Sequence, residues 1–443
     1  MFSDLIIPRN RYYGFFYCFI FILHSADINS NKKLKYYTTN SGDDFSYLIK
    51  QYNNYCLKKY DKSYQIEIVE FENNDEMFTK MSTELMAGEG PDIISLNQKL
   101  PFEKLIENGA FLDINTLINN DKTKDKIDLS EFNSVIMDVG VYNGKRYIVP
   151  LYYGTDVLVS TQERFERFGM SCNNGMPITY SEISNMFSTY FHNQCDYGFV
   201  SNDEKTLLWY DYPLQLFNRF INNYVDFENK VTYFNSNEFK DNLDSMYRMV
   251  KVSTEEKSNT LFDDLYINQS LPFITGNYAY YKSVDETPLI CRGLVKNDNT
   301  YSAFVQLGFG INNNTNFKEQ AYAFIKYALS DDAQMRLCGA KGDVYSSSLA
   351  FPVNKKAYQQ LKVTASKKVD DDDKIIGINN DFICAYINIA EKLNECSLYM
   401  DVSHTYYNSS VIGNIVDKYL NDDISKDKFI RQLTAATKIY LKE

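Results

Sequence analysis

The chain has 443 residues, of which 44% are hydrophobic and 23% charged, so it is long enough for two or three globular domains. This composition excludes a disordered chain and a protein with many membrane spans. Lysine and arginine total 46 against 58 aspartate and glutamate residues, which gives a formal net charge of −12. Because this balance offers no positive excess for a phosphate backbone, we expect no nucleic-acid partner.

Residues 1–26 are typical of a secretory signal peptide. Arg9 and Arg11 precede an apolar run over residues 12–23, which is too short to span a bilayer comfortably. A retained N-terminal anchor and an ordinary buried strand are the alternatives. We expect an extracytoplasmic protein that is secreted, periplasmic or associated with the cell surface, although no lipid-attachment motif surrounds Cys18.

Strand and helix patterns alternate over the first hundred residues. Stretches rich in β-branched and aromatic residues predict strands, and apolar residues at helical spacing predict helices between them. Asn73 with Glu76 forms a possible capping box, and Gly88 supplies a stop. Strands separated by helices in this way predict a parallel sheet with crossover helices. We expect strands at 34–38, 64–71 and 93–96, and helices at 43–60 and between Asn73 and Gly88.

The rest of the chain repeats the mixture of strand and helix. Residues 147–160 are apolar and extended, and the polar interruption at 152–156 indicates a crossing between two lobes. A further apolar strand is predicted at 301–311, followed by a helix. The end of the chain is predicted to be helical. Its expected inward residues are Val411, Ile412, Ile415, Val416 and Tyr419 on one face and Phe429, Ile430, Leu433 and Ile439 on another.

Six short motifs follow one another along the chain in an order that resembles a known family: Gly88-x-Gly-Pro-Asp92, Gly109–Asp113, Tyr142–Pro150, Phe273–Ala279, Gly310–Gln334 and Phe351–Lys355. The chain is similar to the extracytoplasmic solute-binding proteins of ABC importers, in the maltose-binding-like, sugar-binding group. The resemblance implies an α/β, two-lobed periplasmic-binding-protein type II fold, in which each lobe is a mixed sheet flanked by helices and a multi-crossing hinge joins the two.

The family's organisation implies lobe boundaries and a mechanism for this chain. A ligand would sit in the cleft where strand ends and helix N-termini of both lobes converge, and hinge rotation would close the lobes over it. The implied partners are a small solute, for which we expect an oligosaccharide, and the membrane subunits of an ABC permease; we expect a monomer. The predicted N-terminal lobe is 27–151 plus 301–376, the C-terminal lobe 156–300 plus 380–443, and the hinge lies near 151–155, 294–303 and 376–393.

Trp209 is the first candidate for ligand contact. Sugar recognition uses flat aromatic faces and planar polar side chains, and Trp209, Asp211 and Tyr212 offer both within four residues. A core position for Trp209 is the alternative. The other candidates are Tyr152, Tyr153 and Asp156 at the first crossing, Asn40, Ser41 and Asp43 after the first strand (where helix capping is the alternative), Asn97 and Gln98 after the third strand, and, by the resemblance alone, Tyr280, Asp285, Tyr406 and Tyr407.

The cysteines and histidines suggest no metal site. None of the eight cysteines forms a Cys-x-x-Cys pair, and Cys172 with Cys195 is the one loop-flanked pair that we consider for a disulfide. Asp121, Thr123, Asp125 and Asp128 weakly resemble a calcium loop but lack its turn glycine. We therefore expect no metal and no cofactor.

Two other functions compete with transport. A ligand-binding sensor that reports to a membrane receptor would have the same shape. A secreted glycosidase would need two suitably spaced carboxyl groups, and abundant acids leave that open. No strained Gly-x-Ser-x-Gly turn, metal-binding helix or histidine-centred triad emerges, so we expect a binding protein and not an enzyme.

Overall fold

The structure is a computed structural model, and its described part begins at residue 33. It covers most of the chain, with gaps. The described residues are 33–39, 44–96, 100, 102–155, 157–167, 169, 171, 173, 175–179, 181–183, 217–218, 220–221, 224–226, 229–255, 266–268, 289–295, 299–338, 351–368, 380–397 and 410–442.

The chain divides into two compact units. Strand β13 (Ser302–Ile311) crosses the boundary, since it lies in the second unit up to Gly308 and in the first from Phe309. The first unit contains Met1–Ser95, Pro101–Lys126 and Phe309–Ala328; the second contains Leu96–Leu100, Ile127–Gly308 and Leu329–Glu443.

The first unit is built on the predicted parallel strands. Strand β1 (Leu34–Thr39) pairs in parallel with β2 (Ile66–Phe71) on one side and with β3 (Ile93–Ser95) on the other. The last residues of β13 pair antiparallel with β3. The prediction of a parallel sheet with crossover helices is therefore confirmed for β1 to β3, and the carboxyl ends of these three strands lie along one edge.

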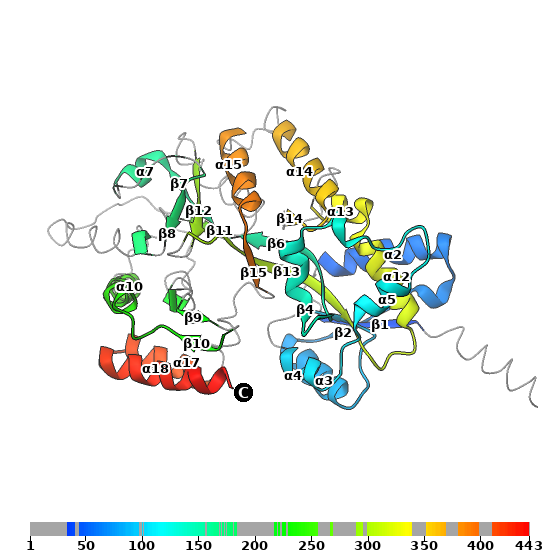
Figure 1. The fold of residues 1–443 in the computed structure, drawn as a ribbon, viewed down its shortest axis with the longest axis horizontal. Helices are drawn as coiled ribbons and strands as arrows, with labels where there is room; N and C mark the ends of the chain where they lie inside the picture. The colour runs from blue at the N-terminus through cyan, green and yellow to red at the C-terminus, as the bar shows by residue number, and fades with distance from the viewer. Residues whose placement is uncertain are drawn as a thin grey trace, which may run out of the picture. The chain divides into compact units, whose positions relative to one another are not determined.

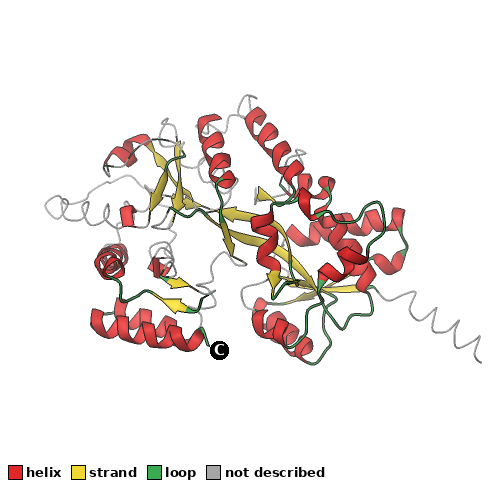
Figure 2. Cartoon of the chain, viewed as in Figure 1, coloured by secondary structure: helices red, strands yellow, loops and turns green. Residues whose placement is uncertain are grey.

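Helices cover both faces of this sheet (Figure 1). Adjacent residues of a strand point to opposite faces: the Tyr37 hydroxyl of β1 donates a hydrogen bond to Glu84 on one face, and the Tyr36 ring meets Phe309 on the other. In Figure 2 the strands of this unit are flanked by helices. The helices of the first unit are α2 (Asp44–Lys59), the 3-10 turn η1 (Lys62–Tyr64), α3 (Asn74–Met86), α4 (Phe102–Glu107), α5 (Ile114–Asn120) and α12 (Lys318–Leu329).

Helix α3 follows its sequence signals closely. The Asn73 side chain accepts a hydrogen bond from the Glu76 N–H at 2.9 Å, as expected of an N-cap. After the helix ends, Gly88 adopts a φ of 80°, which a glycine takes without the steric cost of a Cβ. The predicted inward residues Met77, Phe78, Met81 and Leu85 are all buried.

The described strands of the second unit take part in two sheets and two hairpins. To the seven-stranded sheet this unit contributes β6 (Val149–Thr155), the remainder of β13, β14 (Phe351–Pro352) and β15 (Glu395–Ser397). A four-stranded sheet has the order β11-β7-β12-β8. Its strands are β7 (Val157–Thr161), β8 (Pro177–Thr179), β11 (Tyr266–Asn268) and β12 (Leu289–Val295), and the hairpins are β4 (Val141–Tyr142) with β5 (Lys145–Arg146) and β9 (Val225–Asp226) with β10 (Val231–Thr232).

Some helices of the second unit pack around a hydrophobic core that is rich in aromatic rings. Phe220 stacks on Phe239, and Tyr419 stacks on Phe429. Helices α17 and α18 lie side by side (Figure 1). The helices are η2 (Leu129–Glu131), α6 (Ser134–Met137), η3 (Asp138–Gly140), α7 (Gln162–Arg167), α10 (Asn237–Glu255), α13 (Asp331–Leu337), α14 (Lys355–Lys368), α15 (Asn380–Glu391), α17 (Ser410–Leu420) and α18 (Lys426–Tyr440).

Two of the expected inward residues at the end of the chain are wrong. Val411 and Ile439 are each 59% exposed. Val411 precedes the buried Ile412 by one residue, which turns its side chain by about 100°. Ile439 likewise lies off the face on which Phe429 and Leu433 are buried.

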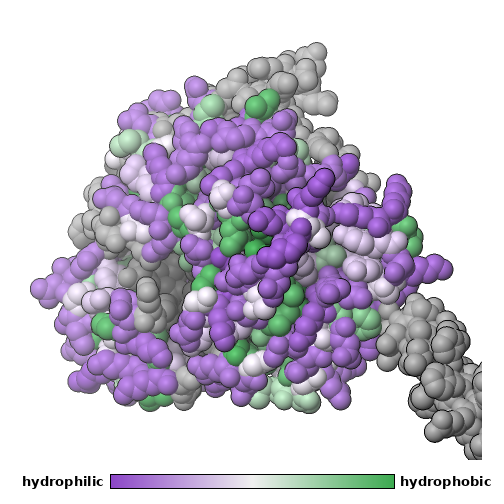
Figure 3. Space-filling view, turned by 45° about the vertical axis from the view of Figure 1, so that its right-hand side comes forward, coloured by the Kyte–Doolittle hydropathy of each residue, from purple (hydrophilic) through white to green (hydrophobic). Residues whose placement is uncertain are grey.

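The described surface carries few hydrophobic side chains. The face drawn in Figure 3 is dominated by hydrophilic residues, with hydrophobic ones in small separate groups. Over the part of the chain that the structure describes, no helix is both long and apolar enough to cross a membrane. Cys56, Cys291 and Cys338 are buried, whereas Cys384 is exposed. Cys172 and Cys195 lie outside the described residues.

Candidate functional site

The carboxyl edge of the parallel strands is the first part of the candidate site. Strands β1, β2 and β3 end there at Thr39, Phe71 and Ser95. The Thr39 hydroxyl approaches the Asn74 side-chain oxygen at 3.4 Å, so the end of β1 meets the start of α3. In α/β sheets, ligands bind outside the carboxyl ends of strands. The predicted residues Asn40, Ser41, Asp43, Asn97 and Gln98 follow β1 and β3 in sequence and lie outside the described residues.

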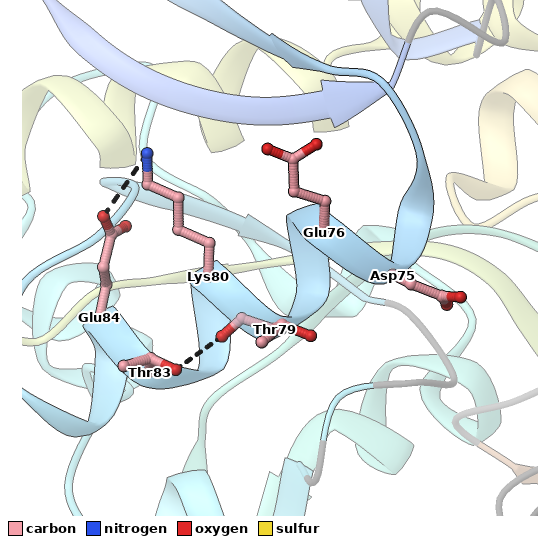
Figure 4. Close-up of a pocket in the computed structure, with 6 residues that line it drawn as sticks. All are labelled: Asp75, Glu76, Thr79, Lys80, Thr83 and Glu84. Atoms are coloured by element: carbon pink, nitrogen blue, oxygen red, sulfur yellow. Dashed lines mark hydrogen bonds and ion pairs between the residues drawn. The ribbon is translucent and has the colours of Figure 1, made fainter.

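A surface depression of about 660 Å³ runs along the outer face of α3 (Figure 4). Its described lining residues all come from that helix: Asp75, Glu76, Thr79, Lys80, Thr83 and Glu84.

The lining of this depression is held by contacts with the sheet. Lys80 points toward Glu84, with 4.0 Å between the nitrogen and oxygen (Figure 4), and lies 5.3 Å above the ring of Phe71. Glu84 also accepts the 2.8 Å hydrogen bond from Tyr37. Burial and the neighbouring Glu84 raise the pKa of Tyr37. None of the described lining residues is aromatic, so this depression lacks the stacking faces expected of the predicted sugar site.

The opposite edge of the same sheet explains the Gly-x-Gly-Pro-Asp motif. Asp92 accepts a hydrogen bond from the Lys35 N–H at 2.7 Å and another from the Thr315 hydroxyl. The motif therefore fastens the start of β3 to β1 and to the loop before α12. Its role in this structure is architectural.

In the second unit, the predicted first crossing lies on β6. Tyr153 is 2% exposed, and its ring centroid lies 5.5 Å from that of Phe351. Burial raises the pKa of Tyr153. Tyr152 is 9% exposed and, as a neighbouring strand residue, points to the opposite face. Thr155 donates to the Ser302 carbonyl at 2.9 Å, which ties β6 to β13. Ligand contact by Tyr152 or Tyr153 stays a prediction.

One polar side chain on β13 escaped the sequence analysis. Gln306 interrupts an otherwise apolar run, and its side-chain nitrogen lies 2.9 Å from the position that a Cβ on Gly154 would take. A lone amide within an apolar strand was the signal that could have singled it out. The remaining predicted contacts fall outside the described residues: Asp156, Trp209, Asp211, Tyr212, Tyr280, Asp285, Tyr406 and Tyr407.

In the loop that weakly resembles a calcium site, lysine ammonium groups bind the acidic side chains. The Lys326 ammonium lies 3.1 Å from Asp121 and 3.4 Å from Asp125, and Lys59 also binds Asp125. Burial alone would raise the pKa of Asp121, but hydrogen bonds from Thr123 and Lys326 lower it to about 2. Among the described residues, no group of acids, cysteines and histidines could hold a metal ion.

A family model described as bacterial extracellular solute-binding protein matches residues 48–374, which is more than half of the chain. The chain belongs to this family of extracellular solute-binding proteins. The resemblance inferred from the six motifs is thereby confirmed. No curated protein sequence matches the chain significantly.

Solved structures agree on the fold at low sequence identity. An ABC substrate-binding protein from Listeria monocytogenes in complex with cycloalternan is similar with a TM-score of 0.61, 14% identity and coverage of 93% of this chain and 99% of that one. The cyclic α-maltosyl-1,6-maltose binding protein from Arthrobacter globiformis is similar with a TM-score of 0.59 and 15% identity, over 93% of this chain and 99% of that one. The sugar-binding protein MalE from Xanthomonas citri is similar with a TM-score of 0.60 and 14% identity, over 93% of this chain and 98% of that one. The α/β fold class of the solute-binding proteins is therefore confirmed.

Proposed function

We propose that this protein is the substrate-binding component of an ABC importer and that its solute is an oligosaccharide. The observation that carries the proposal is membership of the extracellular solute-binding family over residues 48–374. Three structures that share the fold are described as an ABC substrate-binding protein, a cyclic maltosyl-maltose binding protein and a sugar-binding protein. The parallel strands β1 to β3, which end along one edge, supply the kind of edge at which such ligands bind.

The proposed mechanism is capture without chemistry. The solute binds between the proposed lobes, 27–151 plus 301–376 and 156–300 plus 380–443, and rotation about the proposed hinge segments buries it. The bound ligand favours the closed state by its differential affinity for that state. A permease then recognises the closed protein. In this proposal the chain acts as a monomer outside the cytoplasmic membrane, delivered there by residues 1–26.

Calorimetric titration and thermal shift on the purified protein test the proposal. The panel is maltotriose, mannotriose, cycloalternan and cyclic α-maltosyl-1,6-maltose, with amino acids and polyamines as unrelated solutes. A ligand that binds only the folded state at a hundredfold excess over Kd stabilises by about 2.7 kcal/mol. Binding of a saccharide without its hydrolysis supports the proposal. Binding confined to amino acids or polyamines would contradict an oligosaccharide as the solute. Release of shorter sugars would contradict a role in binding alone.

Transport and sensing are separated by the membrane partner. The saccharide-loaded protein should stimulate ATP hydrolysis by its permease reconstituted in vesicles, whereas the ligand-free protein should not. Stimulation of a sensor kinase instead of the permease would identify a receptor-linked binding protein.

A further inference from the structure

Two side chains of β13 pack closely over Gly154 on β6. A Cβ at this position would lie 2.7 Å from the ring of Phe304 and 2.9 Å from the Gln306 side-chain nitrogen. Both distances are shorter than real Cβ atoms show, so the Gln306 carboxamide reaches the glycine only because no side chain stands there. All three residues belong to the second unit.

The Gln306 carboxamide is incompletely satisfied. Its side-chain oxygen is buried and has no hydrogen-bond partner among the residues that the structure describes, although the residue as a whole is partly exposed. A buried acceptor without a partner is costly, and native proteins rarely keep one without a reason. No partner within the described part of the protein accounts for it.

The surroundings of this carboxamide favour a hydroxyl-bearing ligand. Tyr152 and Gly154 are two residues apart on β6 and therefore share a face, so an aromatic side chain lies on the Gln306 side of the sheet. A hydroxyl group both donates and accepts, and thus satisfies a carboxamide in either of its two orientations. Aromatic faces beside planar amides are the combination that sugar recognition uses.

We propose that Gln306 is a ligand-binding residue whose side-chain amide hydrogen-bonds a sugar hydroxyl on the face of the sheet that Gly154 and Tyr152 share. This inference rests on the proposed function and adds to it a residue that the family resemblance did not supply. It also assigns Gly154 a role, which is to admit the carboxamide.

The decisive variant is Gln306→Met, which keeps the length of the side chain and removes both polar atoms. We expect the affinity for the saccharide that binds most tightly in the panel above to fall about tenfold, as for one lost hydrogen bond that leaves a hydroxyl unpaired. The melting temperature of the ligand-free variant should stay equal or rise, because an unpartnered buried oxygen has been removed. Gln306→Glu, which keeps an acceptor, should retain more affinity than Gln306→Met.

Gln334→Met is the matched control. Gln334 is fully buried, and its side-chain oxygen accepts a hydrogen bond from the Asn354 N–H at 3.3 Å. This control should lower the melting temperature and leave the affinity unchanged.

Equal affinity of wild type and Gln306→Met would overturn the inference while the proposed function stands. A clear fall in the melting temperature of ligand-free Gln306→Met would also overturn it, since the amide would then be structural. If the wild type binds no saccharide, the proposed function is wrong, and the proposed hydrogen bond from Gln306 to a sugar hydroxyl is wrong with it.

Discussion

The side-chain nitrogen of Asn312 donates a hydrogen bond to the carbonyl oxygen of Glu89 at 2.8 Å, across 223 residues of sequence. The same nitrogen donates to the Pro91 carbonyl at 3.1 Å, and the Asn312 side-chain oxygen accepts from the Asn314 N–H at 2.9 Å. Asn312 is 3% exposed. One buried amide thus holds the turn before β3 against the loop after β13.

Asn312→Ala should lower the free energy of unfolding by about 2–3 kcal/mol, because it leaves buried backbone groups without partners. Urea denaturation of the ligand-free protein measures the change. Asn313→Ala is the control: its side chain donates one exposed hydrogen bond to the Gly109 carbonyl, at 3.1 Å, and its loss should cost less than about 1 kcal/mol. Equal effects of the two variants would contradict the role of Asn312.

The ion pair of Lys326 and Asp121 predicts a loss of stability in acid. The Asp121 side chain is 5% exposed, and its pKa in the folded state is about 2, below the ordinary value of 3.8. The unfolded state therefore binds more protons between these values, so the pair's contribution is complete above about pH 4 and is lost as the pH falls toward 2. Stability measured between pH 5 and pH 2 should decrease over this interval.

Lys326→Met isolates that contribution. It leaves Asp121 buried without its ammonium partner and should cost about 2 kcal/mol at pH 7, with a flatter dependence on pH below 4. Lys356→Met is the matched control, since Lys356 is 71% exposed in its ion pair with Asp331 and an exposed pair contributes about 0–1 kcal/mol. A Lys326 variant as stable as this control would show that the loop does not depend on the cation.

Local sequence signals predicted the helices and strands of the first unit well, because the signals that mark each element there lie within a few residues of one another. The Asn73 cap, the apolar face of α3 and Gly88 are all readable from short windows. The stretch 147–160 shows the limit. It was expected as one extended segment with an interruption, and the structure divides it into β6 and β7, which belong to different sheets. Alternation along a strand cannot say which partner the strand pairs with.

The site was less accessible to sequence reasoning for a similar reason. Tyr152 and Tyr153 looked equivalent in the sequence, but neighbouring strand residues face opposite ways, so one of them had to point away from any ligand on a given face. Gln306 was missed because its position beside Gly154 results from the pairing of strands some 150 residues apart, and no local pattern encodes that distance.

Tyr153 and Tyr152 should respond differently to mutation. Tyr153→Ala removes a ring packed on Phe351 and should cost about 3–5 kcal/mol of unfolding free energy. Tyr152→Ala, on the face that Gln306 shares, should weaken saccharide affinity by about 1–2 kcal/mol if its ring contacts the sugar. Calorimetric titration and thermal denaturation of both variants provide the comparison. Reduced affinity for Tyr153→Ala measured well below its melting temperature, with Tyr152→Ala unaffected, would reverse the assignment.

Trp209 allows the sugar site to be tested optically, because it is the one tryptophan in the chain. If the indole stacks on a sugar ring, its fluorescence should change on binding, and Trp209→Ala should weaken affinity by about 2 kcal/mol or more. Trp209→Phe should keep much of the affinity, since an aromatic face remains. If Trp209 is instead a core residue, Trp209→Ala should lower the unfolding free energy by about 3–5 kcal/mol and leave affinity, measured well below the melting temperature, nearly unaltered. That second pattern would remove Trp209 from the site and leave Tyr152, Tyr212 or Tyr407 as the aromatic platform.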